Sequence, residues 1–197
     1  MNGIALVISG PAGVGKTTLC DRLLHDFKPI LSRVITVTTR KPRNDEIDGK
    51  DYIFISNSEF DDLKSNNSFL EYAKVHDNQY GSLKGSVHEL FENNHDVLLN
   101  IDVQGAASLK KLESNLGYLQ KRIRSIFIMP QSLNDLKFRL EKRGQDSSEE
   151  IQKRLKTAAK EITLHNQFDH IIYSKTKDDD YRALLNIYKK YTKLHEF

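Results

Sequence analysis

Short apolar runs alternate along this chain with longer segments in which apolar residues recur at helical spacing. The runs at residues 4–8, 97–101 and 123–129 are each followed by such a segment, at 19–27, 106–112 and 133–140. Strands that are apolar on both faces are typical of parallel sheets covered by helices on both sides. The pattern therefore predicts an α/β fold built on a doubly wound parallel sheet.

Two regions interrupt this alternation. Residues 34–87 carry short β-like runs at 33–39 and 51–55, separated by polar turns such as Asp48-Gly49, and this stretch has the character of an insertion. Residues 134–161 are helix-forming and densely charged, which by itself indicates a solvated helical face. Residues 175–197 fit a closing amphipathic helix. Its apolar face would hold Tyr181, Leu184, Leu185, Tyr188 and Tyr191.

Composition excludes several classes of protein. The net charge of +3 is too small to mark a dedicated nucleic-acid or membrane-surface protein. The single cysteine, Cys20, cannot form an internal disulfide, so we expect a reducing compartment, with the cytoplasm as the default. No apolar run near the start approaches the roughly 20 residues of a membrane span, so neither anchor nor signal peptide is expected. The seven histidines show no metal-ligand spacing with Cys20, which argues against structural zinc.

A phosphate-binding loop follows the first apolar run. The segment satisfies G-x-x-x-x-G-K-[ST] between an expected strand and an expected helix. Its glycines let successive backbone N–H groups face one phosphate, and the helix adds its positive end. Lys16 is expected to reach the β- and γ-phosphates of ATP, and the Thr17 hydroxyl to ligate Mg²⁺. The predicted loop consists of Gly10, Pro11, Ala12, Gly13, Val14, Gly15, Lys16, Thr17 and Thr18.

This loop indicates a nucleoside triphosphate but does not identify the acceptor. The guanine-reading Asn-Lys-x-Asp segment of nucleotide switch proteins does not occur in the sequence. Motors and transport ATPases are usually longer chains. A small phosphotransferase is the class that remains.

Candidate acceptor residues lie in the inserted stretch. Arg40 and Arg43 are three residues apart, and a guanidinium can grip a phosphate through two parallel hydrogen bonds. Taken alone, the pair could equally be solvated surface charge, and Tyr52 and Tyr80 could be packed aromatics. Glu71 stands between apolar neighbours, where a carboxylate is usually paired.

Eight segments, taken in order, resemble the guanylate kinases, which are nucleoside monophosphate kinases that phosphorylate GMP. They are GPAGVGKTT, TTRKPR, DGKDY, FLEYAKV, NQYGS, NIDVQGA, RLEKRG and SEEIQKRL. The resemblance implies a three-layer P-loop core with a parallel sheet (1–34, 86–132 and 164–197). It also implies an inserted mixed-β GMP-binding region (35–85) and a helical lid (133–163), with approximate boundaries.

The resemblance also implies the site. ATP and GMP, with dGMP as a further acceptor, would be the substrates, and Mg²⁺ the cofactor. No nucleic acid, membrane or obligate protein partner is implied. Guanine offers two adjacent donors that one carboxylate can accept, whereas adenine lacks that pair. The implied catalytic residues are Lys16, Arg40, Arg143 and Arg154, and the implied GMP-binding residues are Thr36, Arg40, Arg43, Tyr52, Glu71, Tyr80, Ser82 and Asp102.

Two residues keep alternative roles. Asp102 follows a predicted strand, at the edge where ligands of open α/β sheets gather, so we expect it near GMP or the metal-bound phosphates. It could instead cap local backbone. Arg139 lies one helical turn before Arg143, so it could join the lid arginines or pair with Glu141 or Asp135 outside the site.

Several positions depart from the family pattern. Asn100 stands where an acidic residue is common, and Gln145 where threonine is usual. Tyr173-Ser174 replaces an Asn-Asp pair, and this change, like Gln145, concerns the adenine side of the donor pocket.

Two other functions compete with the active kinase. One is an inactive guanylate-kinase-like module that holds a phosphorylated protein partner, and the other is a P-loop kinase for a different acceptor. Such modules have lost P-loop and lid residues, whereas Lys16, Thr17, Arg143 and Arg154 are all present in this chain.

Overall fold

Five parallel strands form the central sheet of the protein. The structure is a computed structural model that describes residues 3–75, 77–112, 117–144 and 146–192. The strand order is β2 (Leu31–Arg33), β7 (Asp96–Asn100), β1 (Ala5–Ser9), β8 (Ile123–Met129) and β9 (His170–Tyr173). All neighbouring pairs are parallel, with Ala5 opposite Val97 on one side and Ile123 on the other. The predicted α/β fold with a parallel sheet is confirmed.

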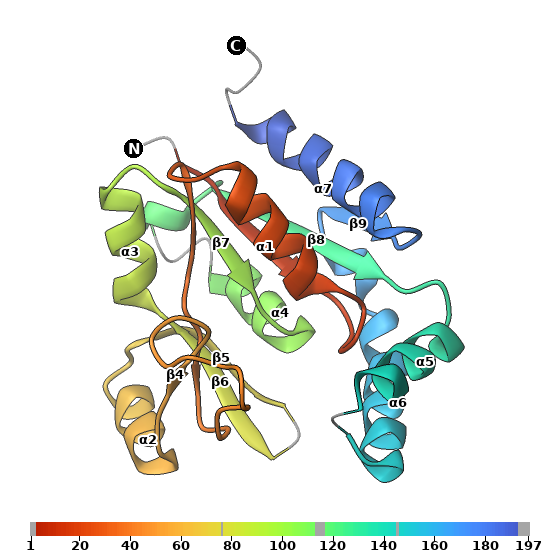
Figure 1. Cartoon of the computed structure of the whole chain (residues 1–197). Helices are drawn as coiled ribbons and strands as arrows, with labels where there is room; N and C mark the ends of the chain where they lie inside the picture. The colour runs from red at the N-terminus through yellow and green to blue at the C-terminus, as the bar shows by residue number, and fades with distance from the viewer. Residues whose placement is uncertain (1–2, 76, 113–116, 145, 193–197) are drawn as a thin grey trace.

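Helices cover both faces of this sheet (Figure 1). Leu6 and Ile8 pack in one core with the helices α1 (Lys16–Asp26) and α7 (Lys177–Tyr191). Ala5 and Val7 pack in a second core with α3 (Lys84–Glu92) and α4 (Val103–Leu112). Successive side chains of a strand point to opposite faces, which is why one apolar run serves both cores. The predicted closing helix is confirmed as α7.

A second sheet of four strands is formed within residues 37–83. Its order is β4 (Ile53–Phe54), β3 (Val37–Thr38), β6 (Asn78–Leu83) and β5 (Phe69–Val75), of which only β3 and β4 are parallel. The sheet is therefore mixed, as the inserted region was predicted to be. Its small core contains Val37, Phe60 and Phe69.

The sequence patterns were wrong at two places in this region. The run 33–39 was expected as one β-like segment, but β2 ends at Arg33 in the parallel sheet and β3 begins at Val37 in the second sheet. β-Branched residues fill the crossing between the strands and β3 itself, from Val34 to Thr39, so the run carries no mark of the break. The helix α2 (Asn57–Ser65) was not predicted, although Ser56 and Glu59 form a capping box at its start. The Asp48-Gly49 turn is confirmed, with φ 74° at Gly49.

Two packed helices form an arm beside the P-loop, on the side opposite the second sheet (Figure 1). They are α5 (Leu133–Arg143), which begins at the Ser132 cap and ends at Gly144, and α6 (Ser148–Ile162), capped by Ser147. Short 3₁₀ turns precede the last two strands, at Gly117–Leu119 and at His165–Gln167. In the described parts of the chain, no helix has the length and apolar character needed to cross a bilayer.

A buried carboxylate joins the start of the chain to its last helix. One oxygen of Asp96 accepts the backbone N–H of Ile4 at 2.8 Å, and the other accepts the hydroxyl of Tyr188 at 2.6 Å. Asp96 is 7% exposed and Tyr188 is fully buried. Burial and the contact with Asp96 raise the pKa of Tyr188, so its hydroxyl stays a donor. β1, β7 and α7 are thereby joined at the amino edge of the sheet.

Replacement of Tyr188 by phenylalanine should lower the free energy of unfolding by about 1–3 kcal/mol, because one oxygen of Asp96 would lose its partner inside the core. Urea denaturation of the two proteins measures the difference. Tyr173→Phe is the matched control, since Tyr173 is 65% exposed, and its effect should stay within about 0.5 kcal/mol. Equal effects of the two substitutions would contradict the assignment.

Candidate active site

The P-loop requires its glycines for steric reasons. Gly10, Gly13 and Gly15 have φ values of 137°, 85° and 107°, which side chains rarely adopt. A Cβ on Gly10 would also lie 2.6 Å from the carbonyl oxygen of Ile128 on β8. The loop therefore packs against the central sheet before it turns into α1, and its backbone N–H groups surround the start of that helix.

Lys16 is held by the loop itself. Its ammonium donates to the carbonyl oxygens of Gly10 at 2.6 Å and Pro11 at 3.0 Å. Burial lowers the pKa of Lys16, and the carboxylates of Glu161 and Asp102 oppose this shift. The lysine is thus a desolvated cation at the bottom of the loop, available to an incoming anion.

The groups next to Lys16 fit a magnesium ion that arrives with a nucleotide. Thr17 is exposed in the first turn of α1, and its hydroxyl accepts a hydrogen bond from the Asn100 amide at 3.4 Å. Mg²⁺ commonly takes one or two protein oxygens together with substrate phosphates and water. Within the described residues, no three His, Cys, Asp or Glu side chains are grouped so that they could hold a metal. Thr17 supplies one neutral oxygen, which suits an ion held together with nucleotide phosphates.

A buried carboxylate faces the P-loop from the second sheet. Glu71 on β5 is only 4% exposed, and one of its oxygens accepts the hydroxyl of the fully buried Ser82 on β6 at 2.7 Å. Burial raises the pKa of Glu71 to about 7; the Ser82 hydrogen bond opposes the shift and the nearby Asp102 carboxylate adds to it. A Cβ on Gly105 of α4 would overlap the other carboxylate oxygen, so this glycine leaves the space that Glu71 fills.

One acidic residue holds both arginines of the inserted region. A carboxylate oxygen of Glu46 lies 2.8 Å from the Arg40 guanidinium and 3.5 Å from that of Arg43, and the other accepts the backbone N–H of Arg43 at 2.8 Å. Burial alone would raise the pKa of Glu46, but these hydrogen bonds bring it below its usual value. The Arg40 guanidinium also lies 5.2 Å from the centre of the Tyr52 ring. The two arginines are therefore positioned before any ligand binds.

Most of the predicted site residues line one cleft at the carboxyl edge of the parallel sheet. The Thr17 hydroxyl, the Glu71 carboxylate and the Arg143 side chain come to it from three different parts of the chain. Ser82 and Arg40 contact residues of the site without being among those that line the cleft. Ser82 is bonded to Glu71, and Arg40 contacts Glu46 and Tyr52. The predicted residues that line the cleft are Gly10, Ala12, Gly13, Lys16, Thr17, Thr36, Arg43, Tyr52, Glu71, Tyr80, Asp102 and Arg143.

The two lid arginines differ in their positions. Arg143 lines the cleft, and burial together with the nearby Arg43 lowers its pKa. Arg154 on α6 is not among the residues that line the cleft; it pairs with Asp146 at 2.8 Å, where the two side chains are 19% and 6% exposed. Its charge nevertheless contributes to the lowered pKa of Arg143, so the two lid arginines lie near each other although only Arg143 lines the cleft.

Asp102 and Arg139, whose roles the sequence left open, each combine the two roles that were considered. One oxygen of Asp102 accepts the backbone N–H groups of Gln104 at 2.7 Å and Gly105 at 3.1 Å, so Asp102 caps α4 and also lines the cleft. Arg139 pairs with Asp135 at 2.9 Å, and its guanidinium also donates to the P-loop carbonyl of Val14 at 3.1 Å. Arg139 is thus tied to the P-loop as well as to its own helix.

Four residues of the site were missed in the sequence. Glu46, three positions after Arg43, gave a signal, because a carboxylate next to two arginines is a natural partner. Asp146 follows Gly144 closely, at the break between two charged helices. Glu161 lines the cleft, and burial raises its pKa, with Lys16 opposing the shift. Neither Glu161 nor Gly105 carries a local pattern that indicates its position.

A neighbouring cavity extends along the P-loop toward α7. Its walls include Thr18, Lys175, Lys177 and Asp180. The buried Ser174 donates to one oxygen of Asp180 at 2.7 Å, while Tyr173 is 65% exposed. Ser174 therefore fixes Asp180 instead of facing this cavity. Gln145, the third departure on this side, lies outside the described residues.

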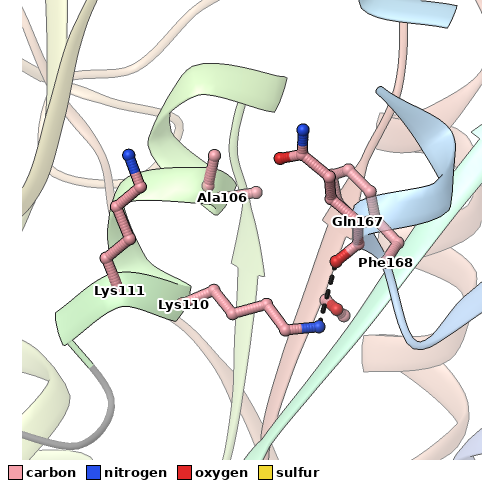
Figure 2. A pocket seen from close by; sticks show the side chains of 7 residues that line it. Ala106, Lys110, Lys111, Gln167 and Phe168 are labelled. Carbon is pink, nitrogen blue, oxygen red and sulfur yellow. Dashed lines mark hydrogen bonds between the residues drawn. The ribbon is translucent and has the colours of Figure 1, made fainter. Parts of the chain in front are cut away.

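A smaller pocket lies between α4 and the segment that precedes β9 (Figure 2). Lys110 crosses its floor and donates to the carbonyl oxygen of Gln167 and to Asp169, both at 2.9 Å. Asp169 also accepts the backbone N–H and the hydroxyl of Ser125 at 2.8 Å. The bonds from Lys110 to Gln167 and Asp169, and from Ser125 to Asp169, connect α4 and β8 to the segment just before β9.

Comparison with known proteins gives a consistent result. A family model described as Guanylate kinase matches residues 3–191. A guanylate kinase from Wolbachia pipientis wMel is 39% identical over 188 residues, which are 95% of this chain and 90% of the relative. One from Nitratidesulfovibrio vulgaris is 42% identical over 187 residues, covering 95% and 86%. The crystal structure of a guanylate kinase from Anaplasma phagocytophilum superposes with a TM-score of 0.74 at 30% identity, covering 95% of this chain and 85% of that one.

The raised pKa of Glu71 makes the stability of the ligand-free protein depend on pH. The folded pKa of about 7 lies above the ordinary 4.5, so the folded state holds the proton more tightly and stability falls as pH rises from 4.5 to 7. Glu71→Gln should therefore be more stable than the parent above pH 7, by on the order of 3 kcal/mol, and nearly equal to it at pH 4.5. Urea denaturation at pH 5 and pH 8.5 measures this, and a difference independent of pH would count against a desolvated Glu71.

Proposed function

The chain belongs to the guanylate kinase family and is a nucleoside monophosphate kinase that uses ATP and GMP, and we propose that the cleft described above carries out the transfer. The observation that carries this assignment of roles is the buried Glu71–Ser82 pair, which lines the same cleft as the P-loop lysine. The family supplies the reaction, and the positions of these side chains support the role of each.

Glu71 is the base-reading residue in this proposal. Its ionised carboxylate accepts the ring N–H and the exocyclic amine of guanine, while Ser82 holds the carboxylate in place. Thr36 lines the same cleft and assists at the base. With AMP, the buried carboxylate would face a base without that pair of donors, so discrimination follows from leaving a buried polar group without a partner.

The acceptor phosphate binds between Arg40, Arg43, Tyr52 and Tyr80. Glu46 already holds the two arginines, so little side-chain freedom is lost when GMP binds. The second pKa of a phosphate monoester is near 6, so at neutral pH the attacking oxygen is largely ionised and needs no general base. Since the proposed contacts involve the base and the phosphate, dGMP is proposed as a second acceptor.

The donor triphosphate binds to the P-loop N–H groups and to Lys16, which exchanges the carbonyls of Gly10 and Pro11 for phosphate oxygens. Thr17 would hold Mg²⁺ together with the nucleotide, with Asn100 and Asp102 beside it. When bound, the ion supplies charge neutralisation on the phosphate oxygens. Lys16 and Thr17 then orient the γ-phosphoryl group toward the acceptor.

The lid arginines complete the site. Arg143 already lines the cleft, and movement of the arm formed by α5 and α6 would bring Arg154 toward the transferred group. In-line transfer spreads negative charge over the moving oxygens, and positioned guanidinium groups stabilise it where it develops. Closure also excludes water, which would otherwise hydrolyse ATP.

The two competing functions use less of this site. A module that only holds a phosphorylated partner has no use for Lys16 or for a lid arginine, yet both line the acceptor cleft. A P-loop kinase for another acceptor has no use for the buried Glu71–Ser82 pair.

The first test measures ADP formation from ATP and Mg²⁺ with GMP, AMP, CMP or UMP supplied separately. We expect turnover with GMP alone, and a loss of at least about 100-fold in kcat for Lys16→Ala, because the lysine stabilises charge on the transferred group. Urea denaturation of Lys16→Ala controls for folding. Absence of turnover in a protein that still binds GMP would favour the binding module.

The second test replaces Glu71 by glutamine and compares the four acceptors. The amide nitrogen cannot accept a hydrogen bond, so kcat/KM for GMP should fall by about 30-fold or more while that for AMP changes little. Ser82 should still hold the side chain, so the fold is retained. An unchanged preference for GMP would remove Glu71 from its proposed role.

A further inference from the structure

Arg33 is a cation of the P-loop cleft that the proposed mechanism does not use. It is the last residue of β2, at the same edge of the sheet as the P-loop, and it lines the cleft beside Thr17 and Thr18. Its guanidinium pairs with Asp21 on α1 at 2.7 Å, and the two side chains are 21% and 57% exposed. Because an ion pair with a largely exposed partner contributes little, Arg33 can exchange Asp21 for a stronger anion.

Asn100 is an uncharged neighbour of Thr17 at the same edge of the sheet. It is the last residue of β7, the strand paired with β2, and its amide donates to the Thr17 hydroxyl at 3.4 Å. An amide carries no net charge, so Asn100 adds no attraction for a cation beside Thr17. Of the groups near Thr17, the Asp102 carboxylate favours a cation, whereas the neutral Asn100 amide and the Arg33 guanidinium leave the side next to β2 open to an anion.

The part of the cleft next to Arg33 has more cationic than anionic side chains on its walls. Among the described residues the carboxylates there are those of Glu46 and Asp51, and Glu46 is already bonded to two arginines, whereas Glu71, Asp102 and Glu161 line the adjoining part. A phosphate chain entering this space therefore meets an excess of positive charge. The cationic side chains on its walls are Lys16, Arg33, Arg43, Arg139 and Arg143.

We propose that Arg33 binds the triphosphate of the donor nucleotide, and that Arg33 and Asn100 together let this protein bind ATP without a divalent cation. A guanidinium forms two parallel hydrogen bonds to phosphate oxygens and offsets part of the charge that Mg²⁺ otherwise neutralises. Transfer still uses the metal; the proposal concerns binding of the nucleotide. It rests on the proposed function only in placing ATP at the P-loop.

Titration calorimetry with ATP, in EDTA and in excess Mg²⁺, tests the proposal on the full chain. For the parent protein we expect the Kd in EDTA to lie within about 10-fold of the Kd in Mg²⁺. Arg33→Met should weaken binding in EDTA by about 10-fold or more, the usual effect of losing one charge-assisted contact, and weaken binding in Mg²⁺ less. Asp21→Asn releases Arg33 from its partner and should tighten binding in EDTA, a gain that misfolding cannot mimic.

Two further variants complete the design. Arg22→Met is the matched control: Arg22 lies on α1 but pairs with Asp178, outside the cleft, so binding should not change. Asn100→Asp should raise the Kd in EDTA and leave binding in Mg²⁺ intact. Equal binding of ATP in EDTA by Arg33→Met and the parent, or a parent whose binding is lost without Mg²⁺, would overturn the proposal. If the parent protein bound no ATP even in excess Mg²⁺, the proposed function itself would fail, which is a different result from the loss of binding in EDTA alone.

Discussion

Repulsion between cations crowded at one edge of a sheet is the constraint under which this active site is built. At an effective dielectric constant of about 20, two like charges 4 Å apart repel by about 4 kcal/mol, more than a surface contact returns. Ion pairs with acidic residues reduce this repulsion: Arg40 pairs with Glu46, and Arg154 pairs with Asp146. Arg143 is the exception, since no ion pair joins its side chain to a carboxylate of the described residues, and burial together with the nearby Arg43 lowers its pKa.

The acidic partners of the arginines differ in their exposure to solvent, and therefore in the strength of their ion pairs. The Glu46 side chain is 15% exposed and that of Asp146 is 6% exposed, so their ion pairs are poorly screened by solvent and fix the arginines in place. Asp21, at 57%, is a weak partner by comparison. The site thus contains both fixed and exchangeable cations. In the proposed mechanism, Arg40 among the fixed cations helps to place the acceptor phosphate, and the exchangeable Arg33 can follow the donor.

Local features of the fold were readable in the sequence, whereas contacts between distant segments were not. The P-loop, its strand and its helix are contiguous, so spacing alone located them. Glu71 was noticed because its immediate neighbours are apolar. Gly105, by contrast, matters only because α4 packs on β5 and brings it against Glu71, which is distant in the sequence, and no local pattern records that packing. The break in the run 33–39 was missed for a similar reason: the two halves differ in their partners, not in their composition.

The helix α4 links the two halves of the molecule. Its first turn is capped by Asp102, its third residue, Gly105, lies against Glu71, and Lys110 near its far end is bonded to Gln167 and Asp169. The wall behind Glu71, the proposed guanine-reading carboxylate, is therefore helix backbone, anchored at both ends. Efforts to reshape the acceptor pocket for another base cannot recruit a side chain from this wall, and have to begin with β5 and β6 instead.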